Sequence, residues 1–187
     1  MNFQAFYNEH VALVWRALHR LGVPAADLPD AVQEVFFVAY RKLPEFEGRS
    51  KASTWLVGIC CRVASDRRRL AHVRHEIGDM DAMLACGDER PGADQLVEQQ
   101  EQAHVLDEIL ALLRPEQREV FVMFELEELS GKEIAAIVGA PLKTVFSRLR
   151  LARTAFTTAL TARQRDGNRV ASRSVAFVAA RGKEEMS

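Results

Sequence analysis

The sequence lacks the features that mark membrane proteins and secreted proteins. Its 187 residues contain no run approaching the roughly eighteen consecutive apolar residues that a membrane-spanning helix needs. The N-terminal stretch MNFQAFYNEH has neither a basic start nor a long apolar run, which argues against a secretory signal. We therefore expect a cytoplasmic protein that does not insert into a membrane.

Cysteine is scarce, and residues suited to catalysis or metal binding form no recognisable pattern. Of the three cysteines, Cys60 and Cys61 are adjacent and Cys86 stands alone, which predicts small buried side chains in a reducing compartment rather than disulfides. Among five histidines only His72 and His75 are closely spaced, and they lie in a basic stretch. There is no phosphate-binding loop, Cys–His couple or catalytic pair of carboxylates. We therefore expect no enzyme activity, no metal and no cofactor.

Net charge is also close to zero, at −1, but the charges are segregated along the chain. Residues 46–76 carry seven basic side chains against three acidic ones, and residues 77–101 carry seven acidic against one basic. Residues 141–187 carry ten basic side chains against three acidic ones. Two basic blocks separated by an acidic one suggest two surfaces that face a polyanion.

What the sequence does contain is helical periodicity. Apolar residues recur at three-and-four spacing in residues 3–21, 30–43 and 54–70, which predicts three N-terminal helices. In the second of these helices the apolar stripe is expected to include Tyr40. The third helix is expected to begin at Ser53 or Thr54, which are good capping residues.

The second half of the chain repeats this helical character after an interruption. Residues 71–103 combine acids, glycine and proline and are interpreted as a linker, with a short helix around 81–84. Helical periodicity resumes in residues 104–126, where Pro115 sits at the first turn of a second helix. No run of strands is visible. The expected fold is all-α, with two small helical domains joined by a linker.

The stretch SGKEIAAIVGAPLKTVFSRLRLAR, residues 130–153, has the pattern of two helices around a tight corner. Ser130 followed by Glu133 is a capping box, and Gly139 is placed to leave the first helix through a left-handed conformation. The second helix is expected to bury Leu142, Val145, Leu149 and Phe156. Its other faces then present Lys143, Thr144, Phe146, Ser147, Arg148, Arg150 and Arg153.

This corner is typical of a helix-turn-helix, in which the second helix lies in the major groove of DNA. Arginine and lysine suit the acceptors of guanine, serine and threonine are permissive, and flanking basic residues reach phosphates. The alternative interpretation is a structural helical hairpin with a solvated basic face.

A second pattern near the middle of the N-terminal half combines aromatic and basic residues. Phe46 and Trp55 flank the short polar loop EGRSK, and a basic helix follows. Bases that leave a duplex must be stacked or pocketed while positive charge follows their backbone, so this combination suits strand separation. Alternatively, Trp55 belongs to the core and Arg67–Arg69 only solvate a helix end.

The order of DAVQEVFFVAYRKL, FEGRSKASTWLVGICCRVASDRRR and LSGKEIAAIVGAPLKTVFSRLRLAR resembles a bacterial RNA polymerase sigma factor. It is most similar to the small extracytoplasmic-function (ECF) group of the sigma-70 superfamily, which keeps only regions 2 and 4. The resemblance implies region 2 at residues 1–75, an acidic linker at 76–104, region 4 at 105–163 and a C-terminal tail at 164–187. It implies a subunit that directs core polymerase to promoters and helps open the −10 element in DNA-templated transcription initiation.

The resemblance also implies roles for individual residues. Contacts with the clamp of the polymerase β′ subunit would come from Asp30, Gln33, Glu34 and Arg41. Contacts with the −10 element would come from Arg49, Ser50, Lys51, Ser53, Trp55, Arg62, Arg67 and Arg68. Contacts with the −35 element would come from Lys143, Thr144, Phe146, Ser147, Arg148, Arg150 and Arg153. Region 4 would also meet the polymerase β flap, and an anti-sigma factor is a further expected partner.

An alternative function stays open at this point. A stand-alone helix-turn-helix regulator would bind duplex DNA without polymerase, although it would leave the N-terminal half unexplained. A helical enzyme is disfavoured because no catalytic constellation is present in the sequence.

Overall fold

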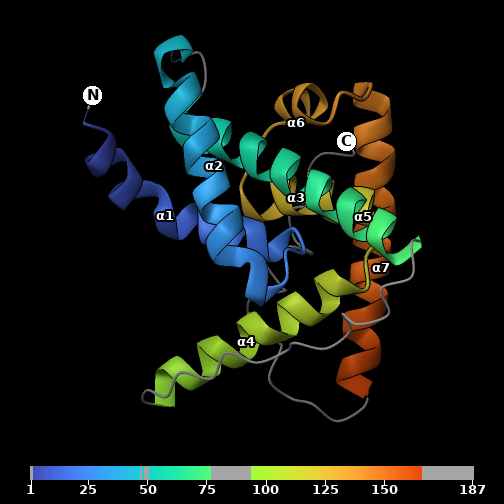
Figure 1. The fold of residues 1–187 in the computed structure, drawn as a ribbon. Coiled ribbons are helices and arrows are strands. Elements are labelled where there is room, and N and C mark those ends of the chain that lie inside the picture. Colours follow the sequence, from blue (N-terminus) through green and yellow to red (C-terminus); the bar gives the residue numbers. More distant parts are fainter. Residues whose placement is uncertain (1, 47, 49–50, 77–93, 166–187) are drawn as a thin grey trace.

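The computed structural model describes residues 2–46, 48, 51–76 and 94–165 (Figure 1). Its longer helices are α1 (Phe3–Arg20), α2 (Leu28–Lys42), α3 (Ala52–Glu76), α4 (Asp94–Ala111), α5 (Pro115–Phe121), α6 (Gly131–Val138) and α7 (Leu142–Arg165). Short 3-10 turns at Ala25–Asp27 and Leu43–Glu45 and a π-helical turn at Val122–Leu126 complete the elements of these ranges. No strand occurs among the described residues. The all-α prediction is confirmed.

The first three helices form a bundle in which each packs against the other two. Leu18 of α1 and Leu56 of α3 are among its most buried side chains. Cys60 and Cys61 are buried in the same core, and loss of solvent raises the pKa of both thiols. The prediction that these two cysteines are small core residues is confirmed, whereas Cys86 lies outside the described residues.

The C-terminal helices build a second layer beside this bundle, with α7 packed along α5 and α6 (Figure 1). Phe121 of α5 stacks on Phe156 of α7 with their ring centroids 4.8 Å apart. Val145 and Leu149 are also fully buried, so the inward face of α7 follows the predicted spacing. As predicted, Pro115 begins the helix after α4.

Tyr40, which was placed on a predicted apolar stripe, is exposed, and the predicted burial of Leu142 was wrong. Tyr40 is 61% exposed, because its ring packs against Phe3 in the first turn of α1, where the covering helix begins. Leu142 is 39% exposed, because it is the first residue of α7 and only one side of it meets Gly131 of α6. In both cases the periodicity is right, but the neighbouring helix does not extend over the residue.

The observed starts of α3 and α4 differ from the predicted ones by different numbers of residues. Helix α3 begins at Ala52, one residue before the expected cap at Ser53, and continues to Glu76. Helix α4 begins at Asp94, inside the stretch that was interpreted as linker, since residues 95–102 are rich in the strong helix formers Gln, Glu and Leu. The short helix expected at 81–84 lies outside the described residues.

The two halves of the molecule meet at a polar seam centred on the C-terminal end of α1. The Arg118 guanidinium of α5 donates to the backbone carbonyls of Arg20 at 2.5 Å and His19 at 3.3 Å. The Arg68 guanidinium of α3 donates to the carbonyl of Leu21 at 3.0 Å and to the carboxylate of Glu119 on α5. Carbonyls at a helix C-terminus lack partners within the helix, so these guanidinium groups satisfy them.

Further contacts extend the seam on both sides. Arg20 pairs with Glu127 at 3.5 Å, and the His19 Nδ1 lies 3.2 Å from an Asp107 carboxylate oxygen on α4. Burial lowers the pKa of Arg118 to about 10 and raises the pKa of the Glu119 carboxyl. The seam therefore contains charged groups that are partly withdrawn from water and satisfied by one another.

The His19–Asp107 contact predicts a pH dependence. The hydrogen bond to Asp107 raises the His19 pKa above 6.5 and outweighs burial and the nearby Arg118 and Arg20, which lower it. A raised folded pKa adds stability below pH 6.5, and this contribution is lost as pH rises through the folded pKa. A histidine NMR titration of the full chain should therefore show a His19 pKa above 6.5. Asp107→Asn should lower it, and an unchanged value in that variant would contradict the contact.

Candidate nucleic-acid interface

The corner between α6 and α7 has the local geometry that the sequence predicts. The Ser130 amide donates to Glu133 Oε2 at 2.8 Å, while the Glu133 amide donates to Ser130 Oγ at 3.3 Å, which completes the capping box. Gly139 ends α6 with φ 64° and ψ 33°, in the left-handed region that favours glycine. The helix-turn-helix prediction is confirmed for these elements.

Helix α7 presents a basic and polar outer face beyond this corner. Lys143, Ser147 and Arg150 are exposed, at the spacing of successive helical turns. Thr144 and Arg148 are partly exposed beside them. The opposite face carries buried Val145 and Leu149, so packing fixes which side of the helix is outermost. Such a face can donate hydrogen bonds to base edges and phosphates.

Phe146 belongs to this surface but also packs within the corner. Its side chain is 45% exposed, and its ring lies edge-on to Phe124 with centroids 6.4 Å apart. A Cβ atom placed on Gly131 would come within 2.9 Å of the Phe146 ring, so a larger residue there requires this half-exposed ring to move. The ring therefore rests on the backbone of α6.

Arg153 is placed differently from the other basic residues of α7. Its Nε donates to Glu125 Oε1 at 2.6 Å, and its guanidinium carbon lies 5.3 Å from the centroid of the Phe124 ring. The Glu125 side chain is only 1% exposed. Arg153 thus neutralises a buried carboxylate within the C-terminal half, a partner that its position in the sequence could not reveal.

The aromatic and basic surface of the N-terminal half is described in part. Phe46 and Trp55 lie with ring centroids 4.9 Å apart, so the two aromatic residues bring the ends of the intervening loop together. Lys51 and Arg62 are exposed, and Ser53 and Trp55 are partly exposed. Arg49 and Ser50 lie outside the described residues.

Two arginines of this surface have partners within the protein. The Arg67 guanidinium makes two hydrogen bonds to Glu34 Oε2 of α2, at 2.9 and 3.2 Å. Arg67 was predicted to contact DNA and Glu34 to contact polymerase, so the pair joins two predicted surfaces. Arg68 lies in the seam with Glu119. The DNA contacts of both arginines stay predictions.

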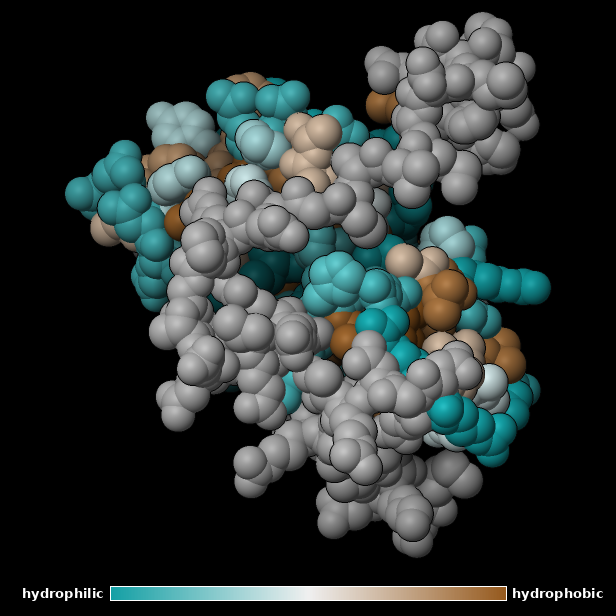
Figure 2. Space-filling model, turned by 90° about the horizontal axis from the view of Figure 1, so that it is seen from below, coloured by the Kyte–Doolittle hydropathy of each residue, from teal (hydrophilic) through white to brown (hydrophobic). Residues whose placement is uncertain are grey.

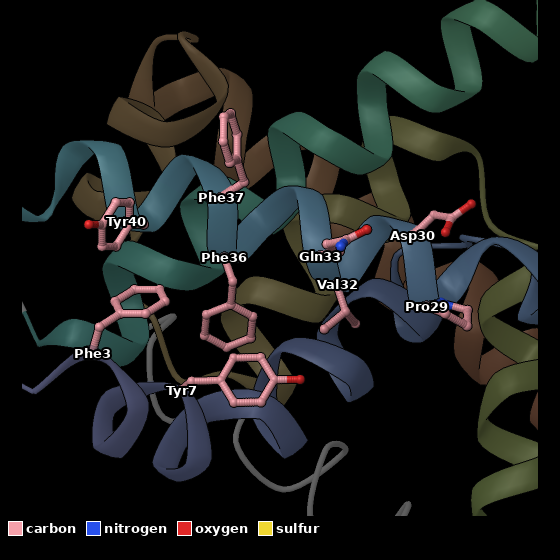
Figure 3. A pocket seen from close by; sticks show the side chains of 9 residues that line it. All are labelled: Phe3, Tyr7, Pro29, Asp30, Val32, Gln33, Phe36, Phe37 and Tyr40. Carbon is pink, nitrogen blue, oxygen red and sulfur yellow. The ribbon is translucent and has the colours of Figure 1, made fainter.

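The surface of α2 contains an aromatic groove that the sequence interpretation missed. Figure 3 shows Phe3 and Tyr7 of α1 facing α2, with Asp30 and Gln33 further along α2. These side chains line an open groove with a volume of about 620 Å³. Phe37 and Tyr40 also line it, and both are about 60% exposed. Glu34 and Arg41 are exposed on the same helix. The available signal was Phe37 itself, an aromatic residue that follows the buried pair Val35–Phe36 and lies off the apolar stripe.

Other kinds of site are not evident in the described ranges. No helix there is long and apolar enough to cross a membrane, and no group of three or more His, Cys, Asp or Glu side chains could hold a metal ion. On the face drawn in Figure 2, hydrophobic residues are interspersed with hydrophilic ones.

Arg153 and Arg150 give a matched test of structural and surface roles. Arg153→Ala leaves the Glu125 carboxylate buried without its partner and should lower the free energy of unfolding by about 3–5 kcal/mol. Arg150→Ala removes an exposed side chain and should change it by less than about 0.5 kcal/mol. Urea denaturation followed by circular dichroism measures both. Equal stability of the two variants would contradict the structural role of Arg153.

Comparisons with known proteins agree with this geometry. Residues 6–72 match the Sigma-70 region 2 family, and residues 103–156 match the family described as Sigma-70, region 4. The ECF RNA polymerase sigma-E factor of Escherichia coli strain K12 is 36% identical over 140 residues, which cover 71% of this chain and 73% of that protein. The probable RNA polymerase sigma-C factor of Mycobacterium bovis is 35% identical over 158 residues, covering 81% and 80%.

Solved structures show the same fold at lower sequence identity. The sigma factor RpoE from Bartonella quintana, in complex with the anti-sigma factor NepR, matches with a TM-score of 0.65 and 22% identity, covering 86% of this chain and 97% of that one. CnrH, in complex with the cytosolic domain of CnrY, matches with a TM-score of 0.57 and 23% identity, covering 86% and 88%. These findings do not favour a stand-alone helix-turn-helix regulator. The chain belongs to the ECF group of the sigma-70 family, the sigma factors that direct RNA polymerase to promoters.

Proposed function

We propose that α7 contacts the −35 promoter element and that the region around Phe46 and Trp55 contacts the −10 element. The observation that carries the first assignment is the outer face of α7. Lys143, Ser147 and Arg150 follow one line along the helix, immediately after a capped and glycine-terminated α6. A recognition helix needs this arrangement to enter the major groove with its N-terminal residues at base edges.

The assignment of the −10 contacts rests on stacking and charge. Phe46 and Trp55 provide aromatic faces, and Lys51 and Arg62 provide exposed positive charge in the same part of the sequence. Unpaired bases stack on aromatic side chains while basic groups follow their phosphates. The predicted contributions of Arg49, Ser50 and Ser53 belong to the same proposal, with a flipped base held near them.

The exposed side of α2 is the proposed docking surface for the polymerase β′ clamp. Asp30, Gln33, Glu34 and Arg41 are exposed there and would supply the polar contacts. The exposed aromatic rings of Phe37 and Tyr40 extend this surface with apolar area. Interfaces of this kind place aromatic anchors within a polar rim. Region 4 is the proposed contact for the β flap.

The remaining parts of the proposal concern regulation and chemistry. Because RpoE and CnrH were solved with NepR and CnrY, an anti-sigma factor is a proposed partner of this chain as well. We propose a cytoplasmic protein that joins the nucleoid with polymerase and has no catalytic activity of its own. The polymerase would supply the chemistry of RNA synthesis.

In vitro transcription tests this function directly. Core RNA polymerase, genomic promoter fragments and the full chain should together give transcripts that start at defined sites, and core enzyme alone should not. Sequencing the transcript ends would identify the promoters. Absence of any initiation that depends on the chain would contradict the proposal.

Variants of α2 test the docking surface. Replacing Gln33 with Ala and Asp30 with Asn should lower the affinity for core polymerase at least several-fold, because both side chains line the exposed groove. Glu9→Gln changes an exposed residue of α1 and serves as the matched control. Affinity can be measured with fluorescently labelled protein. Unchanged affinity in the α2 variants, with folding intact by circular dichroism, would count against the clamp assignment.

A further inference from the structure

We propose that Phe146 reads the C5-methyl group of a thymine in the −35 element. This inference rests on the proposed −35 contacts of α7 and names the base that one of these contacts recognises. It assigns part of the promoter preference of the chain to apolar contact, in addition to the hydrogen bonds that basic and polar side chains can make.

Phe146 lies among the residues of α7 that are proposed to face DNA. It belongs to the second turn of the helix, directly before Ser147 and about one turn from both Lys143 and Arg150. The residue is 45% exposed, so one side of its ring is not covered by the protein. Because the N-terminal residues of a recognition helix lie at base edges, the uncovered side of this ring would lie there too.

The chemistry of the ring decides which base it can recognise. The edges of base pairs in the major groove present hydrogen-bond donors, hydrogen-bond acceptors and one apolar group, which is the C5-methyl of thymine. A phenylalanine ring cannot replace the water on a donor or acceptor, so covering one of these groups would cost free energy. Covering a methyl group instead removes apolar surface of both partners from water. Thymine is therefore the base that this side chain favours.

A neighbouring leucine extends the apolar surface of the ring. Leu142 lies one turn before Phe146 on the same side of α7 and is 39% exposed. A Cβ atom added to Gly131 would lie 3.1 Å from Leu142 Cδ1 and 2.9 Å from Phe146 Cζ, so both side chains rest on the start of α6. The two residues form an apolar strip beside the basic and polar outer face of the helix.

The ring is also held in place before DNA binds. It meets the Phe124 ring edge-on, with centroids 6.4 Å apart. Phe124 is held in turn, because the Arg153 guanidinium carbon lies 5.3 Å from its centroid and Arg153 donates to the buried Glu125 carboxylate. A side chain that is already packed loses little further freedom on binding, so more of the apolar gain contributes to affinity.

Deoxyuridine tests the methyl contact without any change to the protein, since uracil has the hydrogen-bonding groups of thymine and lacks only its C5-methyl group. A promoter that the chain uses is prepared with a randomised −35 region, and the DNA bound by core polymerase together with the full chain is sequenced. Thymine should be preferred at one or more positions, on either strand. Synthetic duplexes with a single deoxyuridine at each of these positions are then compared with the thymine duplex.

At one or more of these positions, deoxyuridine should lower the affinity of the polymerase complex about fourfold, which is the effect of losing one buried methyl-sized group. Deoxyuridine in the spacer between the −35 and −10 elements is the control and should leave the affinity unchanged.

Variants of the chain assign the methyl contact to its residue. Phe146→Ala should bind the thymine and deoxyuridine duplexes equally well. Trp15→Ala removes an aromatic residue of similar exposure, 42%, from α1 and should keep the fourfold difference. Circular dichroism checks that each variant is folded. If Phe146→Ala does not fold, Phe146→Gln takes its place, because it keeps the length of the side chain without its apolar face.

Equal affinity of the unmodified chain for thymine and deoxyuridine at every preferred position would overturn the proposal, as would the absence of any preference for thymine. A methyl effect that survives in the folded Phe146 variant would overturn it as well. In these cases the selection of other −35 sequences would still support the −35 contacts of α7. If the unmodified chain and core polymerase select no −35 sequence at all, the proposed −35 function fails and this inference fails with it.

Discussion

The C-terminal end of α1 is the point on which the arrangement of the whole molecule depends. A helix leaves its last carbonyl groups without partners inside the helix, and here arginines from two other elements supply them. Arg118 comes from α5 and Arg68 from α3, so one short segment is bonded to both halves of the chain. Gly22 makes this convergence possible, since a side chain there would occupy the place of the Arg118 guanidinium.

Three of the carboxylates that bind arginines between helices lie in one stretch, which runs from α5 through the π-helical turn and its cap. Each of the three pairs with an arginine from a different helix. Glu119 binds Arg68 of α3, Glu125 binds Arg153 of α7, and Glu127 binds Arg20 of α1. Because these carboxylates are largely withdrawn from water, each needs its partner to remain charged at low cost. The segment thus organises helices that are distant in sequence.

Local features of the fold could be predicted from the sequence, whereas partners across the fold could not. The capping box at Ser130, the left-handed Gly139 and the inward face of α7 each depend on residues within a few positions. The partners of Arg68 and Arg153 are 51 and 28 residues away. A basic residue next to a DNA-binding pattern has the same sequence signature whether it faces a phosphate or a buried carboxylate. Only the packed structure separates Arg150 from Arg153.

The exposure of apolar residues likewise depends on distant parts of the chain as well as on local periodicity. Periodicity placed Tyr40 on the apolar stripe of α2 correctly, but whether a neighbouring helix reaches that far depends on where α1 begins. Phe37 lies off the stripe and is exposed for that reason. Both residues consequently join the groove beside Asp30 and Gln33. The proposed docking surface on α2 therefore includes aromatic residues that the apolar core does not cover.

The contact between Gly131 and Phe146 constrains how the promoter preference of such a protein can be altered. Lys143, Ser147 and Arg150 have solvent around them, so each can be exchanged without disturbing the hairpin. Phe146 rests on Gly131, where an added side chain would displace its ring. Positions 131 and 146 therefore form one unit for engineering. A library that randomises the exposed face of α7 should either keep Phe146 or vary both positions together.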